Sequence, residues 1–194
     1  MAATLDAIST DLARWISEQP VFFVATAPSG TEGHVNLSPK GLAALAVLGP
    51  RRIAYLDLTG SGVETIAHLR ENGRITIMLC AFSGPPRICR LHGRGVVHPL
   101  GSSGFDTLAG EFPSLPGARS IVNVDVTRIS TSCGFGVPLL DLVGSRDNLT
   151  EWAERKGSDG LVEYRETRNA HSIDGIDGLY GLDGIDASSR PVQQ

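Results

Sequence analysis

Cysteine is scarce in this sequence, and long apolar runs are missing. Cys80, Cys89 and Cys133 are odd in number and show no C-x-x-C spacing, which argues against a disulfide framework and a structural zinc site. No apolar run approaches the ~20 residues of a membrane-spanning helix, and the first residues lack the basic-then-apolar pattern of a signal peptide. We therefore expect a cytoplasmic protein with reduced thiols.

Positive charge is also sparse. The formal net charge is −4, and Lys and Arg form no cluster, so neither a nucleic acid nor an anionic membrane is expected as a partner. What the chain does have is apolar content, 41% of 194 residues. That amount suits one domain with a proper core and an appendage.

The stretch from Arg52 to Cys80 organises the chain as strand, glycine-rich loop, helix and strand. Residues 53–58 are apolar with β-formers, and Gly60-Ser61-Gly62 can take backbone angles closed to other residues. The apolar spacing predicts a helix over 63–72, which Gly73 should end. A helix that follows a loop of small residues points unpaired N–H groups into the loop, which suits an anion such as a phosphate.

A purely structural interpretation of the same loop stays open. Ser61-Gly-Val-Glu64 fits the S-x-x-E capping box, in which the two side chains satisfy the free N–H groups themselves. Glu64 would also place negative charge where a phosphate would lie. The loop is not a known nucleotide motif, since it lacks G-x-x-x-x-G-K and the third glycine of G-x-G-x-x-G.

The rest of the chain up to residue 132 predicts short strands joined by turns. We expect a helix over 3–18, strands over 21–27, 34–38, 53–58, 74–82, 87–98 and 120–132, an apolar run over 42–48, and a short helix over 104–111. Gly93 and Gly95 indicate a bulge or sharp coiling in their strand. With only one strand-helix-strand crossover, the pattern favours a mainly β fold, a six-stranded antiparallel β-barrel with flanking helices.

The character of the chain changes at Cys133, so we divide it into residues 1–132 and an extension over 133–194. The extension begins with a segment rich in Gly and Pro, continues with a short helix over 149–156, and ends in a repeated apolar-Asp-Gly unit over 172–186. This unit lacks the spacing of an EF-hand loop. A tail that is extended over a neighbouring surface, or disordered, is the expected form.

The order of these elements, together with Arg87-Ile-Cys-Arg-Leu-His-Gly-Arg94, resembles the pyridoxamine 5′-phosphate oxidase-like proteins. The likeness covers roughly residues 20–130, and residues 133–179 resemble a tail of an uncharacterised subgroup. The resemblance implies an FMN-binding split β-barrel that works as a homodimer, with each flavin between two subunits. The C-terminal R-L-x-P motif of the true oxidases is missing, so the substrate stays open.

The family motifs place the expected cofactor contacts. Lys40 stands where the family has a phosphate-binding lysine, and Thr59 matches a threonine that touches FMN. The family's S-R-K-x-x-x-L-x-x-N-P motif is altered, because Glu64 and Thr65 replace two cations. In the R-Q-V-R-x-x-G-R motif, the flavin-contacting Gln has become Ile88. The resemblance implies cofactor contacts at Asn36, Ser38, Lys40, Asp57, Leu58, Thr59, Gly60, Ser61, Gly62, Glu64, Thr65, Arg87, Ile88 and Arg90.

Four other residues could carry chemistry, and each has a simpler interpretation. Cys133 could be a reactive thiol, but no Cys-His pair follows from spacing and a partly buried, inert thiol is expected. His68 is expected on the helix face, solvated or packed on Tyr55. His34 and His92 lie on predicted strands, and no third residue completes a metal pattern.

Three functions remain open at this point. The first is an FMN-dependent oxidoreductase acting on an unidentified small molecule. The second is a protein of the same fold that binds a flavin, deazaflavin or tetrapyrrole without turnover. The third is a cofactor-free barrel with an interaction role, whose glycine loop is only capped by Ser61 and Glu64.

Overall fold

The computed structural model describes residues 3–179 and 181. In chain order its elements are β1 (Ala3–Leu5), α1 (Thr10–Ser17), β2 (Phe22–Thr26), β3 (Asn36–Lys40), β4 (Leu45–Gly49), β5 (Arg52–Leu58), α2 (Glu64–Asn72), β6 (Arg74–Cys80), β7 (Ile88–Pro99), α3 (Ser103–Leu108), the 3-10 turn η1 (Ala109–Glu111), β8 (Ala118–Ser132) and α4 (Asn148–Arg168).

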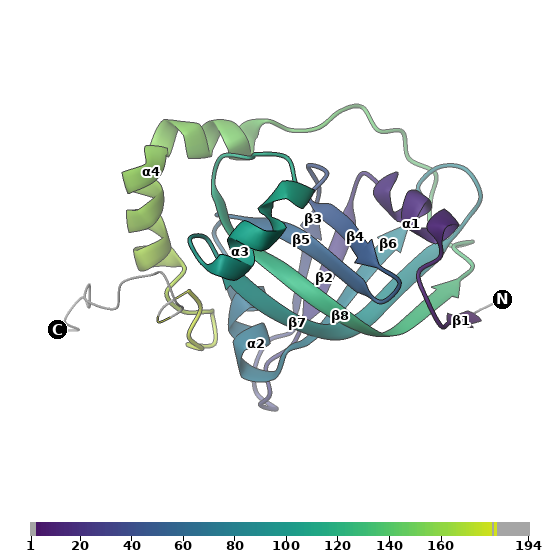
Figure 1. The fold of residues 1–194 in the computed structure, drawn as a ribbon, viewed down its shortest axis with the longest axis horizontal. Helices are drawn as coiled ribbons and strands as arrows, with labels where there is room; N and C mark the ends of the chain where they lie inside the picture. Colours follow the sequence, from purple (N-terminus) through teal and green to yellow (C-terminus); the bar gives the residue numbers. More distant parts are fainter. Residues whose placement is uncertain (1–2, 180, 182–194) are drawn as a thin grey trace.

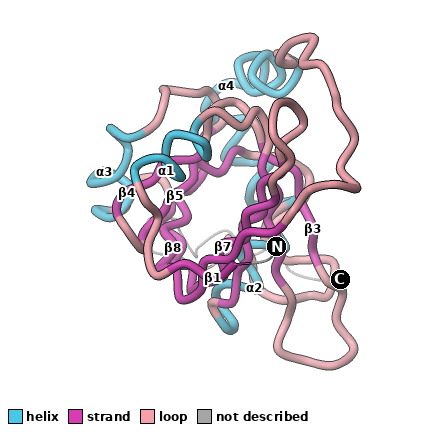
Figure 2. Tube along the Cα trace, turned by 90° about the vertical axis from the view of Figure 1, so that its right-hand side faces the viewer, coloured by secondary structure: helices cyan, strands magenta, loops and turns pink. Residues whose placement is uncertain are grey.

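The strands form one antiparallel sheet that curls on itself, and seen end-on they make a ring (Figure 2). The order is β3-β2-β6-β7-β8-β5-β4, with β1 added beside β8. No pairing joins β3 to β4 within the described residues, so the barrel is split there. The prediction of a mainly β fold is confirmed. The number of strands was wrong, since the sheet has 8 and not six.

The interior of the curled sheet is the hydrophobic core. Tyr55, Ile77, Leu91 and Ile129 come from four different strands and are fully buried. The central strands β5 and β8 are buried over most of their length, because the sheet curls over one face and helices cover parts of the other (Figure 1). Removing apolar side chains of this size from water stabilises the fold by about 1.5–3 kcal/mol each.

Two predicted helices have different bounds in the structure. The first begins at Thr10, because Ser9 is its N-cap and accepts from Leu12 N at 3.2 Å; residues 3–5 form a strand instead. The predicted end of the last helix at Lys156 holds for its first part, because the backbone is non-helical at Gly157 (φ 68°, ψ 177°). A second helical segment, which was not predicted, follows this kink and continues to Arg168, and both segments together are labelled α4. The helix therefore carries the chain to the far end of the barrel (Figure 1).

The predicted irregularity occurs beside Gly93, but the extra residue lies in β8 and not in β7. His92 pairs with Arg128 and Gly93 with Val126, so Thr127 is left unpaired between them. A Cβ on Gly93 would lie 2.3 Å from the Asp125 carbonyl oxygen, so only glycine allows this close approach of the two strands. Gly73 ends α2 in the left-handed conformation, at φ 68°, as expected.

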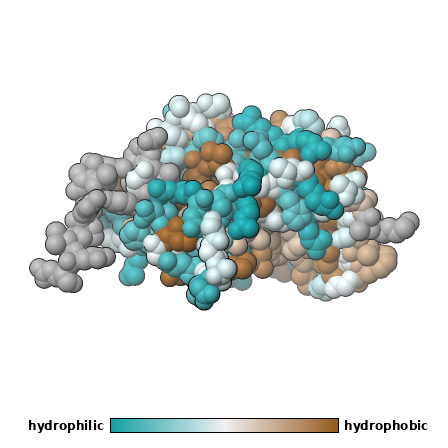
Figure 3. Space-filling model, turned by 90° about the horizontal axis from the view of Figure 1, so that it is seen from below, coloured by the Kyte–Doolittle hydropathy of each residue, from teal (hydrophilic) through white to brown (hydrophobic). Residues whose placement is uncertain are grey.

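The surface is mostly polar, with separate apolar patches on the face seen from below (Figure 3). Exposed apolar side chains gather in the edge strand region at Val35 and Leu37, and in the segment between β8 and α4 at Phe135, Leu139 and Val143. None of the helices in the described part of the chain is long and apolar enough to cross a membrane.

Candidate functional site

A cavity of about 310 Å³ lies at the split in the barrel, between β3, β4 and the end of β5. Its walls also include the loop over residues 59–63, which we call the Gly60 loop, and the start of α2. The side chains and backbone that line it belong to Asn36, Ser38, Pro39, Lys40, Gly41, Leu42, Ala44, Leu56, Leu58, Gly60, Gly62, Glu64, Thr65, Arg119 and Leu149. Because β3 and β4 do not pair within the described residues, the cavity occupies the place where the sheet would otherwise close.

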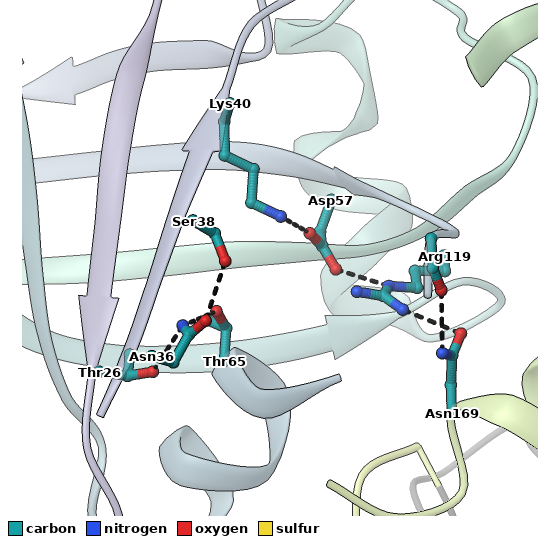
Figure 4. A network of polar contacts seen from close by, with 9 residues as sticks. Thr26, Asn36, Ser38, Lys40, Asp57, Thr65, Arg119 and Asn169 are labelled. Atoms are coloured by element: carbon teal, nitrogen blue, oxygen red, sulfur yellow. Dashed lines mark hydrogen bonds and ion pairs between the residues drawn. The ribbon is translucent and has the colours of Figure 1, made fainter. Parts of the chain in front are cut away.

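A buried carboxylate holds the two cations of this cavity. Asp57 accepts from Lys40 Nζ at 2.5 Å through one oxygen and from Arg119 Nε at 2.7 Å through the other (Figure 4). Burial alone would raise the pKa of Asp57. The charges and hydrogen bonds of Arg119 and Lys40 outweigh burial and bring this pKa down to about 2. Asp57 is therefore ionised at neutral pH, and it fixes where both cations point.

A neutral network forms the wall on the side of β3. Asn36 Nδ2 donates to Thr65 Oγ1 at 2.9 Å and to Thr26 Oγ1 at 3.1 Å, and Ser38 Oγ donates to Asn36 Oδ1 at 2.9 Å (Figure 4). Thr26 Oγ1 also lies 3.0 Å from Nδ1 of the buried His68. The inward face of β3 is thus polar and preordered, and Val35 and Leu37 lie on the exposed side.

The start of α2 has no side-chain cap. The helix begins at Glu64, its N-cap is Val63, and no side chain accepts from its first turn. The capping-box interpretation is therefore wrong. Ser61 lies two residues before the N-cap Val63, outside the first turn of the helix, and it is exposed. The free N–H groups of the first turn remain at the cavity, where they carry partial positive charge.

Glu64 opposes that charge. Its carboxylate lies so close to the Gly60 loop that a Cβ on Gly62 would be 2.4 Å from Oε2, and its Oε1 is 3.4 Å from Ile173 N. Near the cavity two cations, Lys40 and Arg119, are thus matched by two carboxylates, Asp57 and Glu64. An incoming anion would be bound mainly by N–H and hydroxyl donors, with no excess of positive side chains.

The backbone next to the cavity is strained. Leu42 and Ala43 have φ of 62° and 52°, in the left-handed region that costs L-residues roughly 1–2 kcal/mol each. These residues turn the chain from β3 into β4 at the split. Strain of this kind persists where surrounding structure holds it, and it is typical of functional sites.

The structure brings most of the predicted contacts together. Asn36, Ser38, Lys40, Leu58, Gly60, Gly62, Glu64 and Thr65 line the cavity. Asp57 and Thr59 lie buried directly behind it, where Thr59 N donates to Gly117 O at 2.7 Å. Ser61 is exposed and outside the cavity lining.

The three predicted contacts at the start of β7 lie elsewhere. Arg87 is exposed, with its guanidinium 5.2 Å from the centre of the Trp15 ring. Arg90 donates to Ser132 Oγ at 3.2 Å. Neither these residues nor Ile88 line the cavity of their own chain.

The histidines differ from expectation. His68 is not solvated, since it is fully buried, and burial lowers its pKa. His34 precedes β3, and its Nδ1 lies 2.6 Å from Asp174 Oδ1. His92 Nδ1 lies 3.0 Å from Thr76 Oγ1. Cys133 is exposed.

Two polar residues that belong to the cavity wall or support it from behind were missed from the sequence: Arg119 lines the cavity, and Asn169 contacts Arg119. Arg119 is a single arginine at the start of a long strand, and Asn169 follows the last helix of the extension. Neither belongs to a periodic or spaced motif. The described part of the expected tail, residues 172–179, is also not free: it forms a turn that packs on the Gly60 loop through Leu179. The rest of the predicted tail, except residue 181, lies outside the described residues.

Comparison with known proteins identifies relatives of this chain. The family described as pyridoxamine 5′-phosphate oxidase matches residues 8–133. A protein of Aspergillus flavus, the pyridoxamine 5′-phosphate oxidase family protein ustO, is 42% identical over 187 residues, which cover 87% of this chain and 74% of that protein.

A solved structure agrees on the fold. A crystal structure of HupZ from Group A Streptococcus matches with a TM-score of 0.50 and 19% identity, covering 64% of this chain and 99% of that one. Together with the family match and the split between β3 and β4, it confirms the split-barrel prediction.

Proposed function

The chain belongs to the pyridoxamine 5′-phosphate oxidase family, and we propose that it is an FMN-dependent oxidoreductase that acts on a small molecule as a cytoplasmic homodimer. The uncapped start of α2 supports this proposal most directly. It presents unpaired N–H groups to a cavity that also holds Lys40, Arg119 and the hydroxyls of Ser38 and Thr65. Such a donor set suits a phosphate monoester.

The residues present fit an FMN phosphate better than they fit its ring. A volume of about 310 Å³ is near the lower end for ligand pockets. It would take the phosphate and ribityl chain, and the flavin ring would extend to the opening of the split. We propose that a second subunit covers the ring there, and that Arg87, Ile88 and Arg90 contact the cofactor held by the other subunit.

In this proposal the flavin supplies the redox chemistry when it is bound, and the chain supplies position and polarity. Lys40 and Arg119, held by Asp57, would contact the phosphate together with the amides of the Gly60 loop. Asn36 would keep Ser38 and Thr65 oriented toward the ribityl hydroxyls. No side chain of the cavity is assigned as a general base.

Absorbance of the purified protein tests the proposal first. We expect a two-band flavin spectrum, either as isolated or after addition of FMN, and bleaching by NADPH or NADH followed by reoxidation in air. Bound flavin that no donor reduces would favour a binding protein without turnover. A colourless protein that neither FMN nor a deazaflavin stabilises against heat would overturn the proposal, because a ligand at a hundred times its Kd adds about 2.7 kcal/mol.

Fluorescence titration tests the residues. The double variant Lys40→Ala with Thr59→Ala should bind FMN at least tenfold more weakly, since a hydrogen bond to a charged group contributes about 1.5–3 kcal/mol. Lys156→Ala removes a lysine on the exposed side of α4 and serves as the matched control. Equal affinity in the double variant and the control would remove Lys40 and Thr59 from the binding site.

A further inference from the structure

The extension beyond residue 133 returns to the cavity that the barrel forms. After α4 the chain turns back, and Leu179 packs against Val63 and Ile66, with 2% of its surface exposed. Arg70 Nη1 donates to the carbonyl oxygen of Gly178 at 2.5 Å. A Cβ on Gly178 would lie 2.7 Å from both methyl carbons of Val63. The chain after α4 therefore lies directly against the Gly60 loop. We call residues 169–179 the return segment.

Asn169 makes the polar contact between this segment and the cavity wall. It is fully buried, and both ends of its amide are used: Oδ1 accepts from Arg119 Nη1 at 2.9 Å, and Nδ2 donates to the carbonyl oxygen of Gly60 at 3.0 Å (Figure 4). Arg119 and Gly60 both line the cavity, whereas Asn169 does not. One side chain therefore joins a cation of the cavity to its glycine loop.

Neither partner is otherwise fixed as firmly. Arg119 has a long, flexible side chain, and Asp57 holds it at Nε. A second contact at Nη1 sets the plane of the guanidinium and hence the direction of its remaining N–H groups. Gly60 has no side chain through which packing could restrict it. A hydrogen bond to its carbonyl oxygen orients the peptide group that follows, and with it the next N–H of the loop.

We infer that Asn169 is a positioning residue, which holds Arg119 and the Gly60 loop in the arrangement that receives the phosphate end of a flavin nucleotide. This inference rests on the proposed function for the identity of the ligand. The barrel portion that matches the family ends at residue 133. The wall of the cavity in this chain is thus supported from behind by a residue from outside that portion.

Hydrogen exchange on the ligand-free protein tests the coupling by itself. In Asn169→Ala, amides of peptides that span residues 58–66 should exchange at least about fivefold faster than in wild type. Asp174→Ala is the matched control, because it removes both side-chain contacts of the same segment with His34 and leaves Arg119 and Gly60 untouched. Equal exchange over residues 58–66 in the two variants would overturn the inference, whatever the ligand is.

The ratio of FMN to riboflavin affinity tests the role in recognition. Riboflavin lacks the phosphate. In Asn169→Ala the affinity for FMN should therefore fall about tenfold, and the affinity for riboflavin should fall less than threefold. A merely structural role would weaken both ligands equally, and that result would also contradict the inference. If wild type binds neither ligand, the proposed function fails, and the exchange experiment still decides the role of Asn169.

A second variant covers the case in which Asn169→Ala does not fold. Asn169→Asp still accepts from Arg119 but cannot donate to Gly60. In this variant the amide hydrogens of residues 58–66 should exchange faster than in wild type, as they should in the alanine variant. Exchange equal to that of wild type would show that the Gly60 contact positions nothing.

Discussion

Asp57 Oδ2 accepts from Arg119 Nε at 2.7 Å, and both side chains are almost completely removed from solvent. The pair joins β5 to β8 beside the split in the barrel. Lys40, from β3, contacts the other oxygen of the same carboxylate. One buried acid therefore links the strands on both sides of the cavity, although β3 and β4 do not pair within the described residues. The charge that orients the cations also helps to hold the split barrel together.

Asp57→Asn should destabilise the fold strongly. The variant leaves two cations without their shared counter-charge. Removing one partner of a buried ion pair lowers the free energy of unfolding by about 3–5 kcal/mol. Asp125→Asn, on an exposed position of β8, is the control and should change stability by less than about 0.5 kcal/mol. Urea unfolding followed by circular dichroism measures both. Comparable stability of the two variants would mean that the buried pair contributes nothing to folding.

A fall in pH should lower the free energy of unfolding through the same residue, Asp57. The pKa of Asp57 is about 2 in the folded chain, below its ordinary value of 3.8, so its contribution to stability is present above pH ~4. It is lost as the pH falls through ~2, and amounts to about 2 kcal/mol. Unfolding free energies between pH 5 and pH 2 should therefore fall less steeply in Asp57→Asn than in wild type. Identical slopes would argue that the carboxyl titrates normally.

The sequence predicted the central stretch well because its signals are local. A nearly continuous apolar run defines β5, alternating apolar residues define β6, and Gly73 ends α2 where the chain needs a left-handed residue. The strand β4 was harder to predict, since it follows two residues, Leu42 and Ala43, whose positive φ no composition rule suggests. The predicted helix end at Lys156 was correct, since Gly157 interrupts α4 with non-helical backbone angles, and only the second helical segment up to Arg168 was missed.

The candidate site was predictable only in part, for a physical reason. The Gly60 loop is a local motif that the residues themselves indicate, and Lys40 was found through the family resemblance. Arg119 and Asn169 are distant in sequence from these motifs and are joined to them only by the fold. The capping box failed because its Ser and Glu have the right spacing but the helix begins at Glu64, which leaves Ser61 outside the first turn.

Glu64→Gln should tighten the binding of an anion. The carboxylate lies against the Gly60 loop, where it would repel a bound phosphate. Without this repulsion the affinity for the anion should rise roughly three- to tenfold. Stability should fall by no more than about 0.5 kcal/mol, because only a favourable charge near the helix start is lost. Fluorescence titration with FMN measures the affinity. Glu71→Gln, on the same helix but bonded to Ser29 N, is the control; a gain of equal size there would refute a local effect.

Ala43→Gly should stabilise the fold and weaken the site. Ala43 is exposed and has φ of 52°, a conformation that costs L-residues roughly 1–2 kcal/mol and glycine nearly nothing. Glycine loses about 0.5–1 kcal/mol to the greater entropy of its unfolded chain, so we expect a net gain of up to about 1 kcal/mol in the free energy of unfolding.

Ala46→Gly is the matched control for this substitution, because Ala46 lies in β4 opposite Ala54 in ordinary extended backbone. It should destabilise the protein by about 0.5–1 kcal/mol. The gain at Ala43 should be accompanied by weaker FMN binding, since the strained turn holds Leu42 at the cavity and glycine would let that turn relax. A variant that is more stable and binds FMN as tightly as wild type would show that the strain at Ala43 has no part in shaping the site.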